Sequence, residues 1–447
     1  MRAIIIGAGK IGYHIAQVLA RENHDVVLIE MNEERIKAME DTLDIQVIIG
    51  SGTSYRVLEE AGAKEADLLV AVTEVDEVNM ISCVIAKQYG VDKTVARVRN
   101  QEYIMEKKYQ GGLFSDIDLV INPEMETARE IAKLIEVPEA QDVVYYANGM
   151  VQLLELQIPE TATVIGTKLK DLKADFSYLI VAILRNGKML IPRGDDRIEA
   201  EDIVFVMAKL KEMIKVEQLL GMQRLKTSKV MIIGANLAGL NLAKLLEDMR
   251  IQVKLIEKQH KRGREVAQQL KNTIVIHGDG MDLDLLKSEG IEDIDVFVCL
   301  TDDDKLNLLA GLLAKHYGAK RVIAQVRQSD YVALMESVGI DVGISPRLLT
   351  AESILRFIKR GRGVISVTLL CDERAEMLEV ILSEGSRVVN KKIKELNFPQ
   401  GAIIGSIMRK NDVLIATGDD ILQVGDMISV FVLPQALRRV EEYLDIS

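Results

Sequence analysis

The stretch AIIIGAGKIGYHIA, residues 3–16, decides the fold. A short apolar run breaks into three glycines, Gly7, Gly9 and Gly12, and then continues with apolar residues at helical spacing. A strand, a glycine-rich turn and a helix in this order are typical of the first unit of a dinucleotide-binding domain. Gly7 allows the tight turn, Gly9 lets the backbone approach a pyrophosphate, and Gly12 lets helix and strand pack closely.

An acidic residue stands where such a domain binds the ribose. Glu30 closes the next predicted strand, VVLIE, about 20 residues after the glycines. A carboxylate there accepts hydrogen bonds from a ribose 2′-hydroxyl and repels a 2′-phosphate, which favours NAD(H) or another adenine nucleotide over NADP(H). Lys10 adds a cation beside phosphates that the unpaired N–H groups of the helix start would hold. The alternative is a glycine-rich packing turn with a solvated Glu30.

The chain repeats itself. The segment MIIGANLAG, residues 231–239, matches IIIGAGKIG in the first half, so that Gly234 corresponds to Gly7. The similarity extends to the later part of each half, where MLIPRGDDRIEAEDIVFVM at 189–207 matches VLIATGDDILQVGDMISVF at 413–431. Each half therefore consists of a larger unit followed by a smaller one.

Strands and helices alternate in the larger unit, which predicts an α/β fold with a doubly wound parallel sheet. The predicted strands are continuous apolar runs, as expected for a parallel sheet covered on both faces. They span 2–6, 26–30, 45–49, 67–72 and 94–99, and the helices span 10–22, 33–42, 54–61 and 76–89.

The smaller unit is predicted to be a compact α+β lobe. Two β-rich runs flank Asn186-Gly187, which is the strongest short-range signal for a hairpin. The predicted boundaries are 1–123 and 229–346 for two Rossmann-like domains, 124–141 and 347–362 for connecting helices, 142–220 and 363–447 for the lobes, and 221–228 for the linker between the halves.

Composition limits the class of protein. A net charge of -12 argues against nucleic-acid binding, and no apolar run approaches the ~18 residues of a membrane span. The start of the chain is interpreted as a first strand rather than a signal peptide. Three widely spaced cysteines, Cys83, Cys299 and Cys371, are predicted to be reduced core thiols, so that we expect a cytoplasmic protein.

The second copy departs from the glycine pattern. Asn236 replaces the middle glycine, and its side chain would crowd the place where the backbone approaches a pyrophosphate. Leu237 stands where the first copy has Lys10, whereas Glu257 keeps the ribose position. We therefore expect the second site to bind more weakly than the first, or to bind a different nucleotide.

Further candidates stand at the carboxyl ends of the strands. An Asp or Ser after the third strand can meet the adenine edge, and the residues that close the fourth strand lie near the phosphates. These candidates are Ser51 and Asp279 after the third strand, and Thr73, Glu74 and Thr301 after the fourth. Arg97 on the fifth strand reaches either a phosphate or a surface carboxylate, and its counterpart Gln325 has no charge.

No pattern in the sequence indicates a catalytic site. A dehydrogenase needs an acid or base placed against the nicotinamide, usually by a second, substrate-holding domain, and each larger unit here is followed only by a small lobe. None of the five histidines has a titratable partner at a useful spacing, and no metal-ligand set is apparent. We therefore predict no catalytic residue and no metal site.

The whole chain resembles the TrkA family of potassium-uptake regulatory proteins, which are built from RCK domains. The resemblance includes GAGKIG with Glu30, GSGTSYRVLEEAG, ADLLVAVTEVDEVNM, ARVR, NTIVIHGD and the paired GDD segments. It implies domains that bind NAD(H), and in some members ATP or ADP. It also implies a homo-oligomeric ring, peripheral on the cytoplasmic face of the membrane, that gates a separate potassium-translocating transmembrane subunit.

The resemblance also implies which residues contact the nucleotide. In the first copy they are Gly7, Ala8, Gly9, Lys10, Ile11, Gly12, Glu30, Thr73, Glu74 and Arg97, and in the second Gly234, Ala235, Asn236, Leu237, Ala238, Gly239, Glu257 and Thr301. Two other functions stay open: an NAD-dependent oxidoreductase, and a structural scaffold with vestigial pockets.

Overall fold

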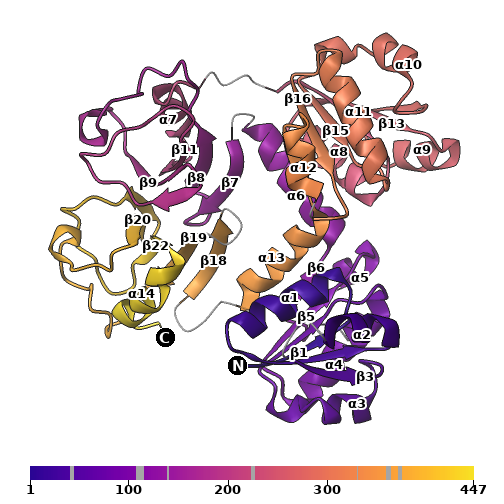
Figure 1. The fold of residues 1–447 in the computed structure, drawn as a ribbon, viewed down its shortest axis with the longest axis horizontal. Helices are drawn as coiled ribbons and strands as arrows, with labels where there is room; N and C mark the ends of the chain where they lie inside the picture. The colour runs from indigo at the N-terminus through magenta and orange to yellow at the C-terminus, as the bar shows by residue number, and fades with distance from the viewer. Residues whose placement is uncertain are drawn as a thin grey trace. The chain divides into compact units, whose positions relative to one another are not determined.

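The computed structural model describes residues 1–40, 45–106, 115–137, 140–222, 227–329, 331–358, 364–370 and 375–446. These residues form two compact units, and each unit combines matching parts of the two repeats (Figure 1). The first unit, Met1–Ala132 with Ser228–Ile358, contains both Rossmann-like domains. The second unit, Lys133–Thr227 with Lys359–Ser447, contains both small lobes.

The first Rossmann-like domain is a parallel sheet with the strand order β3-β2-β1-β4-β5-β6. The order reverses between β1 and β4, which is the switch point where such sheets bind ligands. Its strands are β1 (Arg2–Ile6), β2 (Asp25–Glu30), β3 (Gln46–Ile49), β4 (Leu68–Ala71), β5 (Lys93–Arg97) and β6 (Leu119–Ile121). Its helices are α1 (Lys10–Arg21), α2 (Glu33–Glu40), α3 (Tyr55–Glu60), α4 (Asp76–Tyr89), α5 (Gln101–Glu106) and α6 (Pro123–Glu136).

The second Rossmann-like domain repeats this topology in the order β14-β13-β12-β15-β16-β17, again with parallel strands. Its strands are β12 (Lys229–Ile233), β13 (Gln252–Glu257), β14 (Ile274–His277), β15 (Val296–Cys299), β16 (Arg321–Gln325) and β17 (Val342–Ile344). Its helices are α8 (Leu237–Asp248), α9 (His260–Ala267), α10 (Leu283–Ser288), α11 (Asp304–His316), α12 (Tyr331–Ser337) and α13 (Pro346–Ile358).

The predicted fold class is confirmed, and over the described residues the predicted elements of the first domain agree with the structure to within two residues at each end. Residues 41 and 42 of the predicted helix 33–42 lie outside the described residues. Each sheet also has a short sixth strand, β6 or β17, that the sequence analysis did not predict. Helix α1 of the first domain contacts helix α13 of the second, so that the first unit joins the two repeats (Figure 1).

The strands are apolar on both faces because helices cover both. Ile4 and Ile5 of β1 are adjacent and so point to opposite faces, and both are fully buried. The predicted core thiols Cys83 and Cys299 are buried. The thiol of Cys83 donates to the carbonyl of Val95 at 3.4 Å, and burial raises the pKa of Cys299. Cys371 lies outside the described residues.

The second unit contains two antiparallel sheets, in the orders β10-β9-β11-β8-β7 and β18-β19-β22-β20-β21. The predicted hairpin is confirmed: Asn186 and Gly187 join β9 to β10 with φ of 49° and 74°. The first lobe has β7 (Ala140–Tyr146), β8 (Val151–Gln157), β9 (Tyr178–Arg185), β10 (Lys188–Leu190), β11 (Ile203–Lys209) and α7 (Met213–Leu219). The second has β18 (Val364–Leu370), β19 (Ala375–Ile381), β20 (Ala402–Arg409), β21 (Asp412–Ile415), β22 (Met427–Val432) and α14 (Leu437–Leu444).

The two lobes share a core. Phe205 and Phe431, one from each lobe, are fully buried, with ring centroids 6.2 Å apart. The N–H of Ala147 donates to the buried carboxylate of Glu379 across the same interface at 2.7 Å. Among the described residues, no helix has the length and apolar character needed to cross a bilayer.

Candidate nucleotide site

The glycine loop of the first copy is shaped for phosphates. Gly7 has φ of +102°, a conformation that favours glycine, and a Cβ on Gly12 would lie 1.9 Å from the carbonyl oxygen of Gly7. A Cβ on Gly9 would meet nothing within 4 Å. The N-cap residue of α1 is Gly9, which has no side chain to accept the N–H groups of the first turn. This loop therefore fits a diphosphate.

Glu30 ties the end of β2 to this loop. One carboxylate oxygen accepts the N–H of Ala8 at 2.7 Å, and the other accepts the N–H groups of Met31 and Asn32 at 2.8 and 2.9 Å. Because each carboxylate oxygen has two lone pairs, Glu30 keeps acceptor capacity for ribose hydroxyls. The carboxylate therefore holds the loop, and its contact with a ribose stays a prediction.

A buried asparagine joins the ends of β4 and β5. Asn79 accepts the N–H and the hydroxyl of Thr73 at 2.8 and 2.7 Å, and its amide donates to the carbonyl of Arg97 at 2.8 Å. Asn307 makes the equivalent bonds in the second copy. Asn79 and Asn307 stand at equivalent positions of the two repeats. They fix the strand ends that border the nucleotide site.

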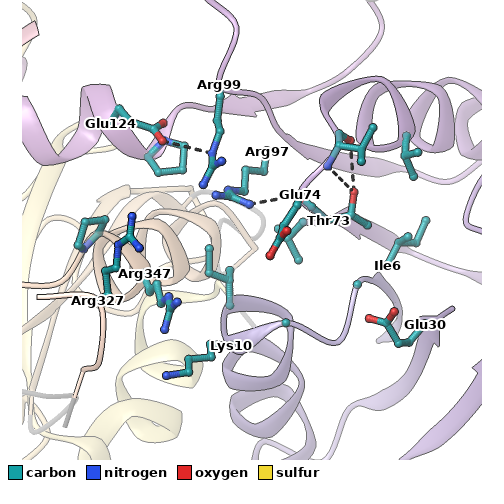
Figure 2. A pocket seen from close by; sticks show the side chains of 18 of the residues that line it. Ile6, Lys10, Glu30, Thr73, Glu74, Arg97, Arg99, Glu124, Arg327 and Arg347 are labelled. Atoms are coloured by element: carbon teal, nitrogen blue, oxygen red, sulfur yellow. Dashed lines mark hydrogen bonds and ion pairs between the residues drawn. The ribbon is translucent and has the colours of Figure 1, made fainter. Parts of the chain in front are cut away.

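A cavity of about 530 Å³ opens beside the first glycine loop, and both Rossmann-like domains line it (Figure 2). It brings together most of the residues predicted for the first site: Gly7, Gly9, Lys10, Ile11, Glu30, Thr73, Glu74 and Arg97. The second domain contributes Asn236, Ala238, Asp302, Gln325, Arg327, Pro346 and Arg347.

Three predicted residues of the first copy do not line the cavity. Ala8 is 2% exposed and donates to Glu30, and Gly12 packs against Gly7. Ser51 lies between two lining residues, and its hydroxyl is 2.8 Å from that of Thr53. The proposed contact of Ser51 with an adenine edge stays a prediction.

Arg97 belongs to the cavity wall rather than to the surface. It is 8% exposed, and one of its terminal nitrogens donates to the carbonyl of Thr73 at 3.1 Å. Burial lowers the pKa of Arg97, and the neighbouring charge of Arg99 lowers it further. Of the two sequence-based alternatives, the pairing with a surface carboxylate is therefore wrong. Arg99 has that kind of partner instead, since it lies 3.2 Å from Glu124.

The second copy has a smaller cavity, of about 260 Å³. The side-chain oxygen of Asn236 accepts the N–H of Gly239 at 3.0 Å, and its amide donates to the carbonyl of Leu300 at 2.6 Å. Asn236 was expected to hinder phosphate binding by its size. Its side chain also accepts the N–H of Gly239, which is an N–H group that a phosphate would need. Leu237 is exposed and lines neither cavity.

The adenosine side of the second site keeps its acidic residue. Glu257 accepts the N–H groups of Ala235 and Gln259 at 2.8 and 2.7 Å, as Glu30 does in the first copy. Asp279, the candidate for the adenine edge, pairs with Lys258 at 2.8 Å, and this bond lowers the pKa of Asp279. The predicted residues that line this cavity are Gly234, Ala235, Asn236, Glu257, Asp279 and Thr301.

Comparison with known proteins identifies the family. The TrkA-N domain model matches residues 3–123 and 230–346, and the TrkA-C domain model matches 153–221 and 377–445. The chain belongs to the TrkA family. Trk system potassium uptake protein TrkA homolog 1 of Methanosarcina mazei is 40% identical over 99% of this chain and all of the relative. Trk system potassium uptake protein TrkA of Halomonas elongata is 35% identical over 100% of this chain and 99% of the relative's own length.

Solved structures share the fold of this TrkA-family chain. The GsuK channel bound to NAD covers 99% of the chain with a TM-score of 0.64 and 17% identity, and the chain covers 79% of that structure. The crystal structure of the GsuK RCK domain gives a TM-score of 0.63 at 17% identity, with 99% and 95% covered. At these identities the likeness establishes the tandem RCK fold alone.

Sequence reasoning missed several charged residues of the first cavity. Arg99 stands in the quoted ARVR segment, but only Arg97 was assigned to the site. Glu124, Arg327 and Arg347 also line the cavity. The signal for Arg327 was the repeat, which pairs it with Arg99, whereas nothing in the sequence shows that Arg347 lies beside the other domain's loop. Among the described residues, no group of three acidic, histidine or cysteine side chains could hold a metal ion.

Proposed function

We propose that this TrkA-family chain is the nucleotide-binding regulatory subunit of a potassium uptake system, acting on a separate potassium-translocating membrane subunit. The relatives that match nearly the whole chain are named Trk system potassium uptake proteins. In this proposal, the chain forms a homo-oligomeric ring at the cytoplasmic face of the membrane. The nucleotide is NAD(H), or ATP and ADP.

One observation carries the nucleotide part of the proposal. The vacant Cβ direction of Gly9, the uncapped start of α1 and the carboxylate of Glu30 all border one cavity. The first-turn N–H groups would hold the diphosphate, Lys10 would add a cation, and Glu30 would accept the ribose hydroxyls. When bound, the dinucleotide supplies negative charge and contact surface between two domains.

A regulatory role agrees with the side chains around this cavity. All five histidines lie in the described part of the chain, and the lining contains none of them. Of the four carboxylates among the lining residues, Glu124 pairs with Arg99, Asp302 pairs with Arg327, and Glu30 accepts the N–H of Ala8. A nucleotide can shift a gate only by the difference in its affinity for the gate's two states. Two domains line this cavity, so a change in the spacing between them would change the contacts of a bound nucleotide. The affinity for the nucleotide would then differ between the two states.

Calorimetry on the full-length chain tests the proposal. We expect NADH and ADP to bind the wild type, and the variant Gly9→Ala to lose binding at the first copy while it keeps its fold. The absorbance of NADH should stay constant when candidate hydride acceptors are added. Consumption of NADH would support the oxidoreductase alternative, and a wild type that binds no adenine nucleotide would support the scaffold.

A further inference from the structure

Helix α9 and the residues on either side of it are basic in an acidic chain. Residues 258–271 contain five lysine or arginine residues and one glutamate, whereas the whole chain has a net charge of -12. The corresponding residues of the first repeat, 31–44, contain two lysine or arginine residues and five aspartates or glutamates. Each segment contains a helix, α2 or α9, so the helix itself does not require the positive charge. The excess of positive charge therefore points to an anionic partner of the second repeat.

The positive charge lies on the solvent side of α9. This helix packs against β13 and β14 at the edge of the second sheet, with Gly263 and Val266 buried on its inner face (Figure 1). Lys261 and Arg264 are about one turn apart on the outer face, and both are exposed. Over the described residues, neither side chain takes part in an ion pair. These two cations are therefore available to a partner.

Other cations of the segment serve contacts within the domain. Lys258 lies 2.8 Å from Asp279. Arg262 donates to the carbonyl of Ala235 at 2.9 Å and lies 3.6 Å from Glu265, the one acidic residue of the segment. Lys258 and Arg262 thus hold the segment against the glycine loop, and the outer cations are not needed for this.

The loop after α9 adds a third cation and an apolar side chain. Glu247 of α8 accepts the N–H groups of Lys271 and Thr273 at 3.0 and 2.7 Å, which fixes the backbone of this loop. Lys271 is exposed, and no ion pair of the described residues includes its side chain. Ile274, the first residue of the edge strand β14, is 57% exposed. An exposed apolar side chain beside basic residues is typical of proteins that bind at the headgroup level of a bilayer.

We propose that the basic face, formed by Lys261, Arg264, Lys271 and Ile274, docks on the anionic surface of a lipid bilayer. Anionic headgroups attract the three cations, and Ile274 enters the headgroup region. The cytoplasmic loops of membrane proteins carry an excess of Lys and Arg, so a membrane subunit complements this face less well than the lipid does. The inference goes beyond the proposed function, because lipid binding requires neither a nucleotide nor the membrane subunit.

Vesicle sedimentation with the full-length chain and no membrane subunit tests the proposal. We expect binding to vesicles of phosphatidylcholine with phosphatidylserine, no binding to phosphatidylcholine alone, and weaker binding as salt is added. The double variant Lys261→Glu/Arg264→Glu should weaken binding about tenfold or more. The matched control Arg438→Glu/Arg439→Glu makes the same change of charge on exposed residues of α14 and should bind as the wild type does. A wild type that binds neither vesicle or both equally, or an equal loss in both double variants, overturns the proposal.

A second variant separates a lipid partner from a protein partner. Ile274→Ser leaves every charge in place and should weaken vesicle binding about three- to tenfold, because it removes the apolar side chain that leaves water on docking. The first turn of α2 contains Glu33 and Glu34, so a second copy of the chain is the competing partner. If Lys261→Glu/Arg264→Glu dissociates an oligomer in light scattering and leaves vesicle binding unchanged, the face is a contact between copies and the proposal is wrong. A chain that binds no vesicle and still controls potassium flux refutes this inference alone.

Discussion

The side-chain oxygen of Asn236 accepts a hydrogen bond from the N–H of Gly239 at 3.0 Å, whereas Gly9, the equivalent of Asn236 in the first repeat, has no side chain to cap its helix. This bond distinguishes two glycine loops that are otherwise built alike. In both, the first glycine has a positive φ, and a Cβ on the last would clash with the carbonyl of the first. The N–H that the first copy offers to a phosphate is already occupied in the second.

Removing that cap should strengthen nucleotide binding at the second site. In a Gly9→Ala background, where the remaining binding reports the second copy, we expect Asn236→Gly to tighten ADP binding about two- to tenfold, the worth of one released hydrogen-bond donor. Glycine replaces an asparagine cap at a cost of only a few tenths of a kcal/mol, so the fold should persist. Calorimetry of the double variant measures the change. Asn272→Gly, on an exposed loop, is the control, and equal affinity in both double variants would show that the cap is irrelevant.

Substitutions of two glycines in the first loop should have different effects, one on nucleotide binding and the other on stability. A methyl group on Gly9 enters open space, so Gly9→Ala should keep the melting temperature and lose NADH affinity about tenfold or more. A methyl group on Gly12 would meet the carbonyl oxygen of Gly7, so Gly12→Ala should lower the stability of the first unit by about 1–3 kcal/mol. Thermal melts and calorimetry on both variants check this. A Gly9→Ala protein that binds NADH normally would contradict the placement of the phosphates.

The fold and the first site were largely readable from the sequence because they depend on local patterns. Glycine spacing, apolar strands and a carboxylate after the second strand are all set by residues close in the chain. The short strands β6 and β17 were missed because three residues carry too little periodicity to stand out. The cap made by Asn236 was missed for a different reason: the residue was seen as bulk, and its hydrogen-bonding ability was not used.

Glu30 should set the choice between NADH and NADPH. Arg35 has a terminal nitrogen 4.0 Å from a carboxylate oxygen of Glu30. In Glu30→Gln the repulsion of a 2′-phosphate disappears and Arg35 becomes available to it, so the ratio of NADPH to NADH affinity should rise. Competition binding measures the ratio, with Glu257→Gln as the matched change in the second copy. An unchanged ratio would argue against a ribose at Glu30.

Asp295 should make stability depend on pH. Burial alone would raise the pKa of Asp295, but bonds from Lys320 and from the backbone of Ser228 and Lys229 outweigh it and lower the pKa to about 2. A carboxylate with a lowered pKa in the folded state stabilises the fold above its unfolded value, near 4, and loses that effect as the pH falls towards 2.

We therefore expect Asp295→Asn to lower the free energy of unfolding by about 1–2 kcal/mol at pH 7, with the difference from wild type shrinking between pH 4 and pH 2. Denaturant titrations across this range provide the measurement. Asp293→Asn is the control, because the side chain of Asp293 is 77% exposed. A difference that is the same at pH 7 and pH 3 would mean that the charge of Asp295 is not responsible.

The cavity between the two Rossmann-like domains could not be predicted from either repeat alone. Arg347 follows Pro346 at the start of a helix, and this position in the sequence indicates a helix terminus and no binding site. It becomes part of a site because the packing of the repeats places it on the cavity that Gly9 and Lys10 also line. Such long-range proximity has no local signature, whereas Arg99 and Arg327 stand two residues after Arg97 and Gln325 and could have been assigned from that spacing.

The central claim is that a nucleotide in the first glycine loop controls a potassium pathway without being consumed. The most direct measurement is potassium flux through the membrane subunit reconstituted with this chain, with NADH, ADP or ATP present and the nucleotide analysed afterwards. We expect the flux to differ between nucleotides for the wild type and to become independent of them for Gly9→Ala, with each nucleotide recovered intact. The account would be contradicted if the wild-type flux were the same with every nucleotide. It would also be contradicted if the flux with Gly9→Ala still depended on the nucleotide.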